Sequence, residues 1–353
     1  MKLIHGFTYR ELFGLAIQRP LMAQLEVTRN CNQSCMFCFR ACRPQLRFPD
    51  KPLSAWVKAV KKMVAIGIRE LNFSGGEVFL YQDLVELMQT AKRFGINKIV
   101  VNTNGLVDLR RQDLGAIDEL VFSLHDLDAA HDQVTGTKGS FERAVRSLEH
   151  ALGSVPRVGI NTVVTEENIT RLPVIYHRFA GLPLAYHAFN LAIDQQADAK
   201  KMERIRRLLP GYLSFLHSLP DDRRKLRHGL QNIFCRDPQL FKGAVPLPHC
   251  AAGKYKIVVD YLGDVYPCRY FQKPAYRCGN IFTDDLERVW KQGKGFKVFR
   301  DLITEKPLPT TCRTCLKRGR CRGGCLAWRP SDAINHTYDR DFRCAPGHAY
   351  LRG

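Results

Sequence analysis

Between residues 21 and 193, apolar and polar positions alternate with two different periods, which predicts strands separated by helices. Short apolar runs with the length and β-branched content of buried strands lie at residues 21–28, 70–74, 98–103, 119–124, 157–165 and 184–193. Helical periodicity marks the segments near residues 54–65, 83–94, 141–151 and 169–179. Strands interleaved with helices favour an α/β fold of parallel βαβ units, with Ser54 as the cap of the first helix.

The pattern changes after the last of these strands. Residues 198–234 are predicted to form a helical linker, and after Cys235 Gly, Pro, Cys and turn residues become frequent. This C-terminal part has too little periodic apolar sequence for an ordinary core, and metal ligation can compensate for that. We therefore predict an N-terminal lead-in at residues 1–20, a barrel at residues 21–197, a helical linker at residues 198–234 and a Cys-rich domain at residues 235–353.

Length and composition indicate a globular protein of more than one domain. The chain has 353 residues, of which 45% are apolar and 25% charged, which excludes a disordered or fibrous class. No apolar span reaches the roughly 20 residues that a bilayer requires, and the N-terminus lacks the pattern of a secretory signal. We expect a cytoplasmic protein with no membrane partner.

The net charge of +20 favours anionic partners. Suitable partners are an acidic peptide, a carboxylate-rich small molecule, or an acidic electron carrier of the flavodoxin or ferredoxin type. The basic residues are spread along the chain without an interleaved aromatic stripe, so we expect no nucleic-acid partner.

The chain has thirteen cysteines in clusters, which favours metal ligation in a reducing compartment over disulfides. Cys31, Cys35 and Cys38 form a C-x3-C-x2-C loop directly after the first predicted strand. Such a loop can hold three irons of a cubane cluster and leave the fourth without a protein ligand, whereas a structural zinc site is normally closed by four ligands. A three-Cys zinc loop is the alternative interpretation.

The spacing of these cysteines, with Phe37 before the last, resembles that of the radical S-adenosylmethionine (radical SAM) superfamily. In that family the free iron chelates the amino and carboxylate groups of SAM, and the reduced cluster cleaves SAM to a 5'-deoxyadenosyl radical. The resemblance implies a partial (β/α)6 TIM-like barrel with its chemistry at the C-terminal strand ends. Cys42 would extend the loop to a fourth ligand and block the open iron, so we expect it to be a bystander.

The turn after the second strand, Ser74-Gly75-Gly76-Glu77, strengthens the resemblance. Its glycines would let the backbone approach a ligand, and the family's G-G-E turn binds the amino group of SAM. The residues to which the resemblance gives SAM contacts are Phe37 (adenine), Gly75, Gly76 and Glu77 (amino group), and Asn104 and Ser123 (ribose). Strand-end Asn and Ser also cap helices, and Phe37 could serve only packing. His125 and His131 are candidate acids, with a structural role as the alternative.

A second set of cysteines resembles the SPASM extension of radical SAM enzymes. C-x2-C-x5-C-x3-C begins at Cys312, and the segment Gly263–Cys268 fits the G-x4-C element of the extension. The resemblance implies two auxiliary clusters and so three 4Fe-4S clusters in all. The outer auxiliary cluster would be held by Cys312, Cys315, Cys321 and Cys344, and the inner one by Cys250, Cys268 and Cys325. For the fourth inner ligand Cys278, Cys235 and an open iron remain alternatives, and zinc is the alternative for the whole block.

These features predict a radical SAM/SPASM enzyme that abstracts hydrogen from a peptide, with oxidation or cross-link formation through the auxiliary clusters. Sulfatase-maturing relatives carry an Asp where this chain has Arg269, which with Arg40 and Arg43 could instead anchor a substrate carboxylate. A structural salt bridge is the alternative for these arginines. No leader-recognition domain is visible, so a separate protein could present the peptide. The alternatives are a cofactor-building enzyme acting on a carboxylate-rich tetrapyrrole and a non-catalytic iron-sulfur electron carrier or scaffold.

Overall fold

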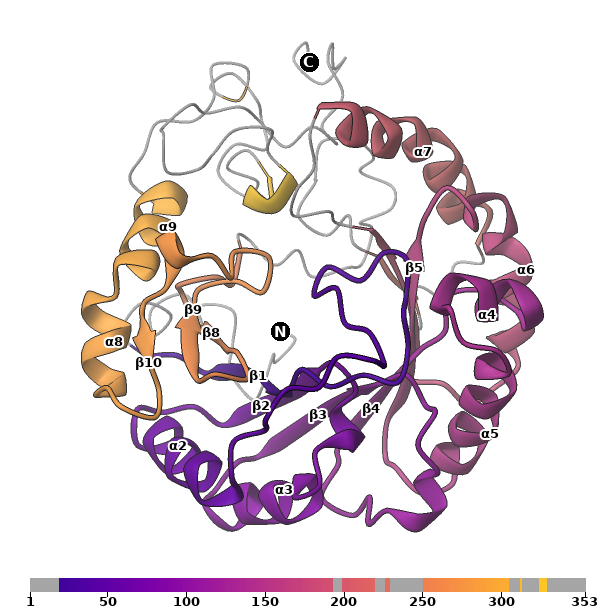
Figure 1. The fold of residues 1–353 in the computed structure, drawn as a ribbon. Coiled ribbons are helices and arrows are strands. Elements are labelled where there is room, and N and C mark those ends of the chain that lie inside the picture. The colour runs from indigo at the N-terminus through magenta and orange to yellow at the C-terminus, as the bar shows by residue number, and fades with distance from the viewer. Residues whose placement is uncertain are drawn as a thin grey trace, which may run out of the picture.

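The computed structural model describes residues 19–192, 199–219, 226–228, 250–304, 312 and 324–328. In these residues the chain forms one curved sheet of ten strands in the order β10-β9-β8-β1-β2-β3-β4-β5-β6-β7 (Figure 1). Its central strands are β1 Met22–Thr28, β2 Glu70–Gly75, β3 Lys98–Thr103, β4 Glu119–Ser123, β5 Val158–Val164 and β6 Tyr186–Leu191. These six are parallel to their neighbours and agree with the predicted strands within a few residues.

Helices cover the outer face of the arc, as Figure 1 shows for α2 to α6. The helices are α2 Leu53–Ala65, α3 Leu84–Arg93, α4 Asp128–Thr135, α5 Ser140–Leu152, α6 Leu172–Ala180, α7 Ala199–Ser218, α8 Leu286–Gln292 and α9 Lys294–Thr304. The prediction that Ser54 caps the first helix was wrong. Helix α2 begins one residue earlier at Leu53, and its N-cap is Pro52, whose ring leaves no side-chain donor or acceptor for capping.

The strands present opposite faces to two environments. In β1, Ala23, Leu25 and Val27 belong to the main apolar core beneath the helices. Gln24 and Glu26 alternate with them and lie on the concave side, where they contact residues of the C-terminal part of the chain. At β1 the concave side is therefore polar as well as buried, which suits a binding site better than a core.

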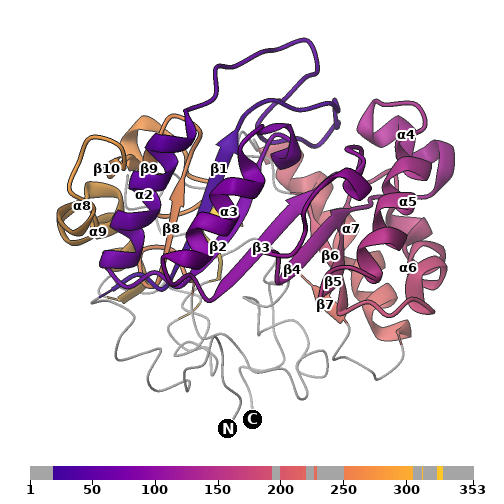
Figure 2. The same cartoon turned by 90° about the horizontal axis from the view of Figure 1, so that it is seen from below.

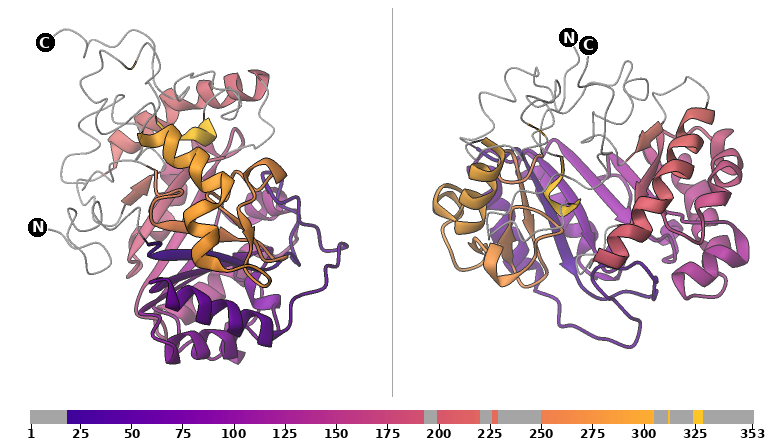
Figure 3. Two further views of the ribbon diagram at one scale, coloured as in Figure 1. Left: turned by 90° about the vertical axis from the view of Figure 1, so that its left-hand side faces the viewer. Right: turned by 90° about the horizontal axis from the view of Figure 1, so that it is seen from above.

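The C-terminal part of the chain extends this sheet. β8 Lys256–Val259 runs parallel beside β1, and β9 Asp264–Tyr266 and β10 Gly279–Asn280 follow as antiparallel strands. Ile257, Trp290 and Phe296 belong to the same apolar cluster as the barrel core. Figure 3 shows α8 and α9, in orange, continuing the outer helical layer beside α2.

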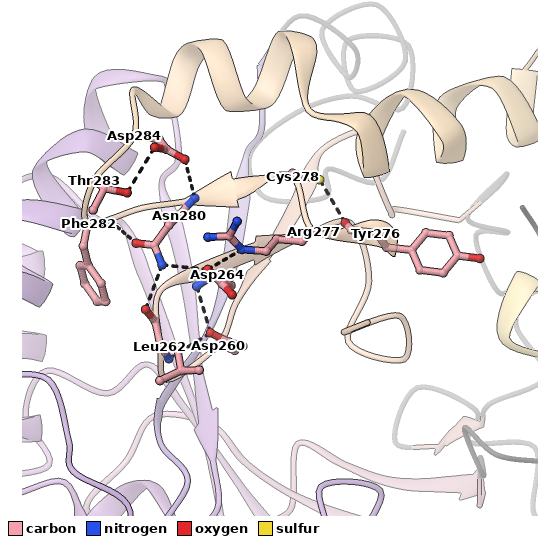
Figure 4. A network of polar contacts seen from close by, with 10 residues as sticks. All are labelled: Asp260, Leu262, Asp264, Tyr276, Arg277, Cys278, Asn280, Phe282, Thr283 and Asp284. Carbon is pink, nitrogen blue, oxygen red and sulfur yellow. Dashed lines mark hydrogen bonds and ion pairs between the residues drawn. The ribbon is translucent and has the colours of Figure 1, made fainter. Parts of the chain in front are cut away.

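A polar network fixes the turns between β8, β9 and β10 (Figure 4). The Asp264 carboxylate accepts from Arg277 at 2.7 Å and from the Asn280 amide at 2.8 Å, while Asp260 accepts from the backbone N–H of Asp264 at 2.9 Å. Gly263 has φ +88°, and a Cβ there would lie 2.3 Å from the Phe282 ring, so only glycine fits this turn. The network holds the hairpin that leads to Cys268.

The described strands form an open arc whose edges are β10 and β7 Leu226–His228. β7 lies in the range expected to be a helical linker and pairs in parallel with β6. Figure 2 shows the sheet from below, with the helices outside it and the loop after β1 extending beyond the strand ends. Among the helices described, none has the length and apolar character needed to cross a membrane.

Candidate active site

A cavity of about 550 Å³ opens at the C-terminal ends of the parallel strands. This size is typical of small-molecule sites, which span roughly 300–1,000 Å³. The predicted site residues that line it are Cys31, Cys35, Cys38, Phe37, Gly75, Gly76, Glu77, Asn104, Ser123, His125 and Arg269. The structure therefore brings together residues at or directly after the ends of β2, β3 and β4, the loop after β1 and the segment after β9.

The cysteine loop is closed at its neck by contacts within the loop and is attached to the barrel at its tip. At the neck, the Asn30 side chain accepts from the Phe48 N–H and donates to the Phe48 carbonyl oxygen, each at 2.9 Å. At the tip, the N–H groups of Ser34 and Met36 donate to the carbonyl oxygens of Thr135 and Val134, at 2.9 and 3.0 Å. The end of α4, a helix that the sequence analysis did not predict, thus supports the loop between its first and last cysteines.

The thiols of this loop line one side of the cavity. Burial raises the pKa of Cys31 to about 11 and that of Cys35 to about 12, so a metal that binds there must displace their protons. The described residues contain no three Cys, His, Asp or Glu side chains gathered around a single-ion site. Because each iron of a cubane takes a separate thiolate, the three thiols of one loop fit a cluster as donors.

Cys42 lies beside Cys38. It is 2% exposed and lines the same cavity. A hydrogen bond from its thiol lowers the pKa of Cys38 to about 6, the main influence on that group. The structure thus puts a fourth thiol next to the three predicted ligands, and its role as a bystander stays a prediction.

The Gly75-Gly76 turn is required by the cysteine loop. A Cβ on Gly75 would lie 2.4 Å from the Thr28 carbonyl oxygen, and one on Gly76 would lie 2.1 Å from that of Asn30. The Gly76 N–H donates to Thr28 at 2.9 Å and the Glu77 N–H to Asn30 at 2.7 Å. The glycines therefore let the turn pack on the backbone that leads into the cysteines, a reason that the sequence analysis did not give.

Glu77 is 1% exposed and accepts hydrogen bonds at both oxygens. Oε1 accepts from the Phe79 N–H at 3.1 Å and the Thr103 hydroxyl at 2.8 Å, and Oε2 accepts from the Asn104 N–H at 2.7 Å. Burial raises the pKa of the Glu77 carboxyl, and these three donors partly offset that effect. Since a carboxylate has about four acceptor positions, the described hydrogen bonds leave one position on Oε2 unused.

Asn104 also ties the strand ends to the cysteine loop. Its side-chain NH2 group donates to the Asn32 side chain at 2.7 Å, and its side-chain oxygen Oδ1 accepts from the Leu106 N–H at 3.0 Å. Both ends of this side chain are thus engaged with the protein at the cavity wall. Ser123, at the end of β4, lies on the same wall.

His125 packs against Phe37, with ring centroids 4.6 Å apart and planes at 82°. Its Nδ1 accepts from the Val163 N–H at 3.2 Å, which leaves the proton of the neutral ring on Nε2. Burial holds the pKa of His125 well below its usual value, and the nearby His131 lowers it further. His125 is thus a neutral donor at the wall, and the His131 ring accepts from its backbone N–H at 3.2 Å.

Two pairs of asparagines lie on the concave face, and three of the four, Asn72, Asn161 and Asn190, were missed by the sequence analysis. Asn102 donates to Asn72 at 2.8 Å, and Asn190 donates to Asn161 at 2.6 Å. Three of the four, Asn102, Asn161 and Asn190, line the cavity. A signal was present, because Asn is depleted in strands and each of these interrupts a buried apolar run.

The predicted arginines have different surroundings. Arg269 lies at the cavity wall with its guanidinium carbon 5.6 Å from the Phe39 ring centroid. Arg40 forms an ion pair with the buried Glu26 at 2.9 Å, so it is not an open anchor for a substrate carboxylate. Arg43 is exposed and donates to the Cys42 carbonyl oxygen at 2.7 Å.

Four of the predicted auxiliary ligands, Cys250, Cys268, Cys312 and Cys325, are described by the structure, while Cys315, Cys321, Cys344 and Cys235 lie outside the described residues. Cys250 and Cys268 pack on a small apolar cluster with Tyr276 and Phe299. Burial raises the pKa of both thiols to about 11. The charge of Cys268 raises the pKa of Cys250 further, and the charge of Cys325 raises the pKa of Cys268 further. These three predicted inner ligands are thus neighbours.

Cys278 has other neighbours. Its thiol donates to the Tyr276 carbonyl oxygen at 3.4 Å, and a Cβ on Gly295 would lie 2.9 Å from its sulfur. It packs against the main core. Ligation by Cys278 stays an untested alternative.

Comparison with known families supports the resemblance noted in the sequence. The family model of the radical SAM superfamily matches residues 25–178, and that of the SPASM iron-sulfur cluster-binding domain matches residues 250–316. A PqqA peptide cyclase of Gluconobacter oxydans is 22% identical over 326 residues, which cover 87% of this chain and 85% of the relative. The mycofactocin maturase MftC of Mycobacterium tuberculosis is 27% identical over 344 residues, which cover 90% of this chain and 81% of the relative.

Solved structures share the fold. Streptococcus suis SuiB bound to its precursor peptide SuiA has a TM-score of 0.70 at 18% identity, covering 95% of this chain and 78% of SuiB. Native anSMEcpe with bound AdoMet has a TM-score of 0.71 at 18% identity, covering 92% of this chain and 94% of that structure.

Proposed function

Because the chain belongs to the radical SAM superfamily and carries a SPASM domain, we propose that it is a SAM-cleaving enzyme that modifies a peptide. The observation that carries the proposal is the cavity at the strand ends, where the C-x3-C-x2-C thiols face the Gly75-Gly76-Glu77 turn. The donors of a cluster and the contacts for SAM are thereby gathered around one volume.

In this proposal Cys31, Cys35 and Cys38 hold the SAM-binding cluster. When bound and reduced, the cluster and SAM supply a 5'-deoxyadenosyl radical that abstracts hydrogen. The free acceptor position of Glu77 and the adjoining turn would hold the ammonium group of SAM, with Asn104 and Ser123 near the ribose and Phe37 near the adenine. His125, held in one tautomer by the Val163 N–H, would donate from Nε2 into the cavity.

The auxiliary part supports the oxidation that follows. We propose two further four-iron clusters, an inner one at Cys250, Cys268 and Cys325 and an outer one at Cys312, Cys315, Cys321 and Cys344. Cys268 leads directly to Arg269 and Tyr270, which line the cavity. An inner cluster there would lie close to a substrate radical and could accept its electron.

A peptide is the substrate class that the relatives favour. PqqA peptide cyclase is named for its peptide, and SuiB was solved with its precursor peptide. The net charge of +20 suits an acidic peptide, an acidic reductant of the flavodoxin or ferredoxin type, or both. We propose that the enzyme acts in the cytoplasm, where its thiols stay reduced, and that a separate protein could present the peptide.

The first test is anaerobic reconstitution with iron and sulfide, followed by dithionite and SAM. The proposal expects 5'-deoxyadenosine from the wild-type protein and none from a Cys35→Ala variant. A protein that keeps its clusters but forms no 5'-deoxyadenosine would instead be an electron carrier or scaffold. Peptide modification is then tested with precursor peptides encoded beside the gene.

A further inference from the structure

Three polar side chains, Glu26, Arg40 and Gln272, form a closed ring of contacts between the N-terminal and C-terminal parts of the described chain. Glu26 of β1 pairs through Oε2 with Arg40 at 2.9 Å and accepts at Oε1 from the Gln272 amide at 2.9 Å. Arg40 in turn donates to the Gln272 side-chain oxygen. Each member thus contacts the other two, although Gln272 is 246 positions from Glu26.

The ring joins two turns that bear predicted cluster ligands. Arg40 lies two residues after Cys38, and Gln272 lies four residues after Cys268. The rings of Phe39 and Tyr270 are adjacent, with centroids 5.7 Å apart. A second contact therefore lies directly beside the polar ring, and both come from the same two turns.

We propose that Arg40 is a positioning residue that locks the turn after Cys38 to the turn after Cys268. It would thereby fix the SAM-cluster loop relative to the inner auxiliary ligands and hold the cavity wall between them. The inference rests on the proposed function only in taking Cys38 and Cys268 as cluster ligands.

The electrostatics explain why this position needs arginine. The Glu26 side chain is 3% exposed and that of Arg40 is 17% exposed, so the ion pair is largely withdrawn from water. Removing the cation would leave a buried carboxylate without its charge partner, which is among the more damaging changes to a protein interior. The planar guanidinium can donate to Glu26 and Gln272 together, whereas a lysine ammonium lacks that fork.

The lock predicts a reciprocal effect, because a coupling free energy between two segments acts equally in both directions. Loss of Arg40 should loosen the turn at residues 269–277, and loss of Gln272 should loosen the loop at residues 39–48. Two backbone amides report on the turns, since Ala41 N–H donates to Cys38 and Phe271 N–H donates to Cys268, each at 3.0 Å. Arg43→Ala is the matched control, as it removes an arginine of the same loop that contacts only the Cys42 carbonyl oxygen in the described bonds.

The experiment is hydrogen–deuterium exchange of the reconstituted holoprotein under anaerobic conditions. We expect Arg40→Ala and Gln272→Ala each to speed exchange about tenfold at both Ala41 and Phe271, as loss of a charge-assisted hydrogen bond predicts. Arg43→Ala should change exchange at neither Ala41 nor Phe271. Exchange that rises only in the mutated segment, or equally in Arg43→Ala, would overturn the inference.

A potentiometric EPR titration gives a second readout, in which Arg40→Lys separates the charge of Arg40 from its hydrogen-bonding fork. Cluster potentials respond to nearby charge, so Arg40→Ala, which leaves the Glu26 charge uncompensated, should lower the potential of the inner auxiliary cluster. Arg40→Lys should restore the potential while leaving exchange at Phe271 raised, because it keeps the charge and loses the fork. An unchanged potential in Arg40→Ala contradicts the inference.

These readouts separate the inference from the proposed function. Exchange and potential are measured whether or not SAM is cleaved, so a protein that forms no 5'-deoxyadenosine could still show the lock. Conversely, a wild-type protein that cleaves SAM, with Arg40→Ala behaving as Arg43→Ala, would retain the function and lose the lock. If Arg40→Ala fails to fold, Gln272→Ala decides the question, since it leaves the ion pair with Glu26 in place.

Discussion

Replacing Gly76 with alanine tests whether the Gly-Gly turn and the cysteine loop form one unit. The added Cβ would lie 2.1 Å from the Asn30 carbonyl oxygen, 2.6 Å from the Asn30 carbonyl carbon and 2.7 Å from the Arg29 carbonyl oxygen. All three neighbours are backbone atoms, so no side chain can swing away to relieve the contact. The turn and the loop must instead separate by about 1 Å to reach ordinary van der Waals contact.

A separation of that size breaks the bonds that join the two segments. The Glu77 N–H to Asn30 bond, now 2.7 Å, would lengthen beyond hydrogen-bond range, and the Gly76 N–H to Thr28 bond at 2.9 Å would weaken with it. Two backbone bonds contribute about 0.5–1.5 kcal/mol each, and overpacking costs about 1–3 kcal/mol. We expect the free energy of unfolding to fall by about 2–6 kcal/mol.

The assay is anaerobic urea unfolding followed by tryptophan fluorescence, with iron measured on the same samples. The variant should also lose the N-terminal cluster, about four irons per chain, while the auxiliary irons stay bound. Gly181→Ala is the control, because nothing lies within 4 Å of its added Cβ and its φ is −77°. Full iron and unchanged stability in Gly76→Ala would refute the reasoning.

Three further predictions concern two residues that line the cavity, Tyr186 and Cys42, and one buried histidine outside it, His187. Tyr186→Phe removes the hydroxyl that donates to the buried Glu119 carboxylate at 2.7 Å, and should lower the free energy of unfolding by about 1.5–3 kcal/mol in urea titrations. Lys98 and Arg157 pair with the same carboxylate at 3.0 and 3.4 Å, and no change in stability would mean that Glu119 is satisfied without the hydroxyl. Burial lowers the pKa of His187 to about 3, so the folded protein binds this proton less readily than the unfolded chain. The protein therefore has its full stability with respect to this group above the usual histidine pKa and loses stability as the pH falls toward about 3. In the His187→Phe variant, the decrease in the free energy of unfolding between about pH 7 and pH 5 should be smaller by about 2 kcal/mol. A replacement of the exposed His177 should leave that sensitivity unchanged, and an equal effect would contradict the burial argument. Cys42→Ala should keep SAM cleavage and full iron, whereas loss of iron would make Cys42 a ligand.

The fold of the barrel was predictable because its strands are nearly continuous apolar runs, such as Ile99–Val101, bounded by turns. Helix α4 was missed because its residues are largely polar and its place depends on backbone bonds to Ser34 and Met36, far away in the sequence. β8 was missed as part of the barrel sheet because a run of only four residues, Lys256–Val259, carries no sign of pairing with β1. Pairing partners at such separation are set by tertiary packing.

The parts of the candidate site that follow from motif spacing in the sequence were predictable. The C-x3-C-x2-C loop and the Gly-Gly-Glu turn line one cavity, as their positions after consecutive strands implied. Contacts between distant segments were not predictable, and Arg40 illustrates this because its partners Glu26 and Gln272 are 246 positions apart in the sequence. The clash that requires Gly76 is likewise a property of two backbones in space rather than of the motif.

The central claim is that the cluster at Cys31, Cys35 and Cys38 has an iron that takes SAM as its ligand. The most direct test is the EPR spectrum of the dithionite-reduced wild-type protein before and after SAM is added. The account predicts that the signal of this cluster changes on SAM addition and that a Cys31, Cys35 and Cys38→Ala variant, which keeps only auxiliary irons, shows no change. A wild-type spectrum that is indifferent to SAM, with the N-terminal cluster intact, would contradict the account.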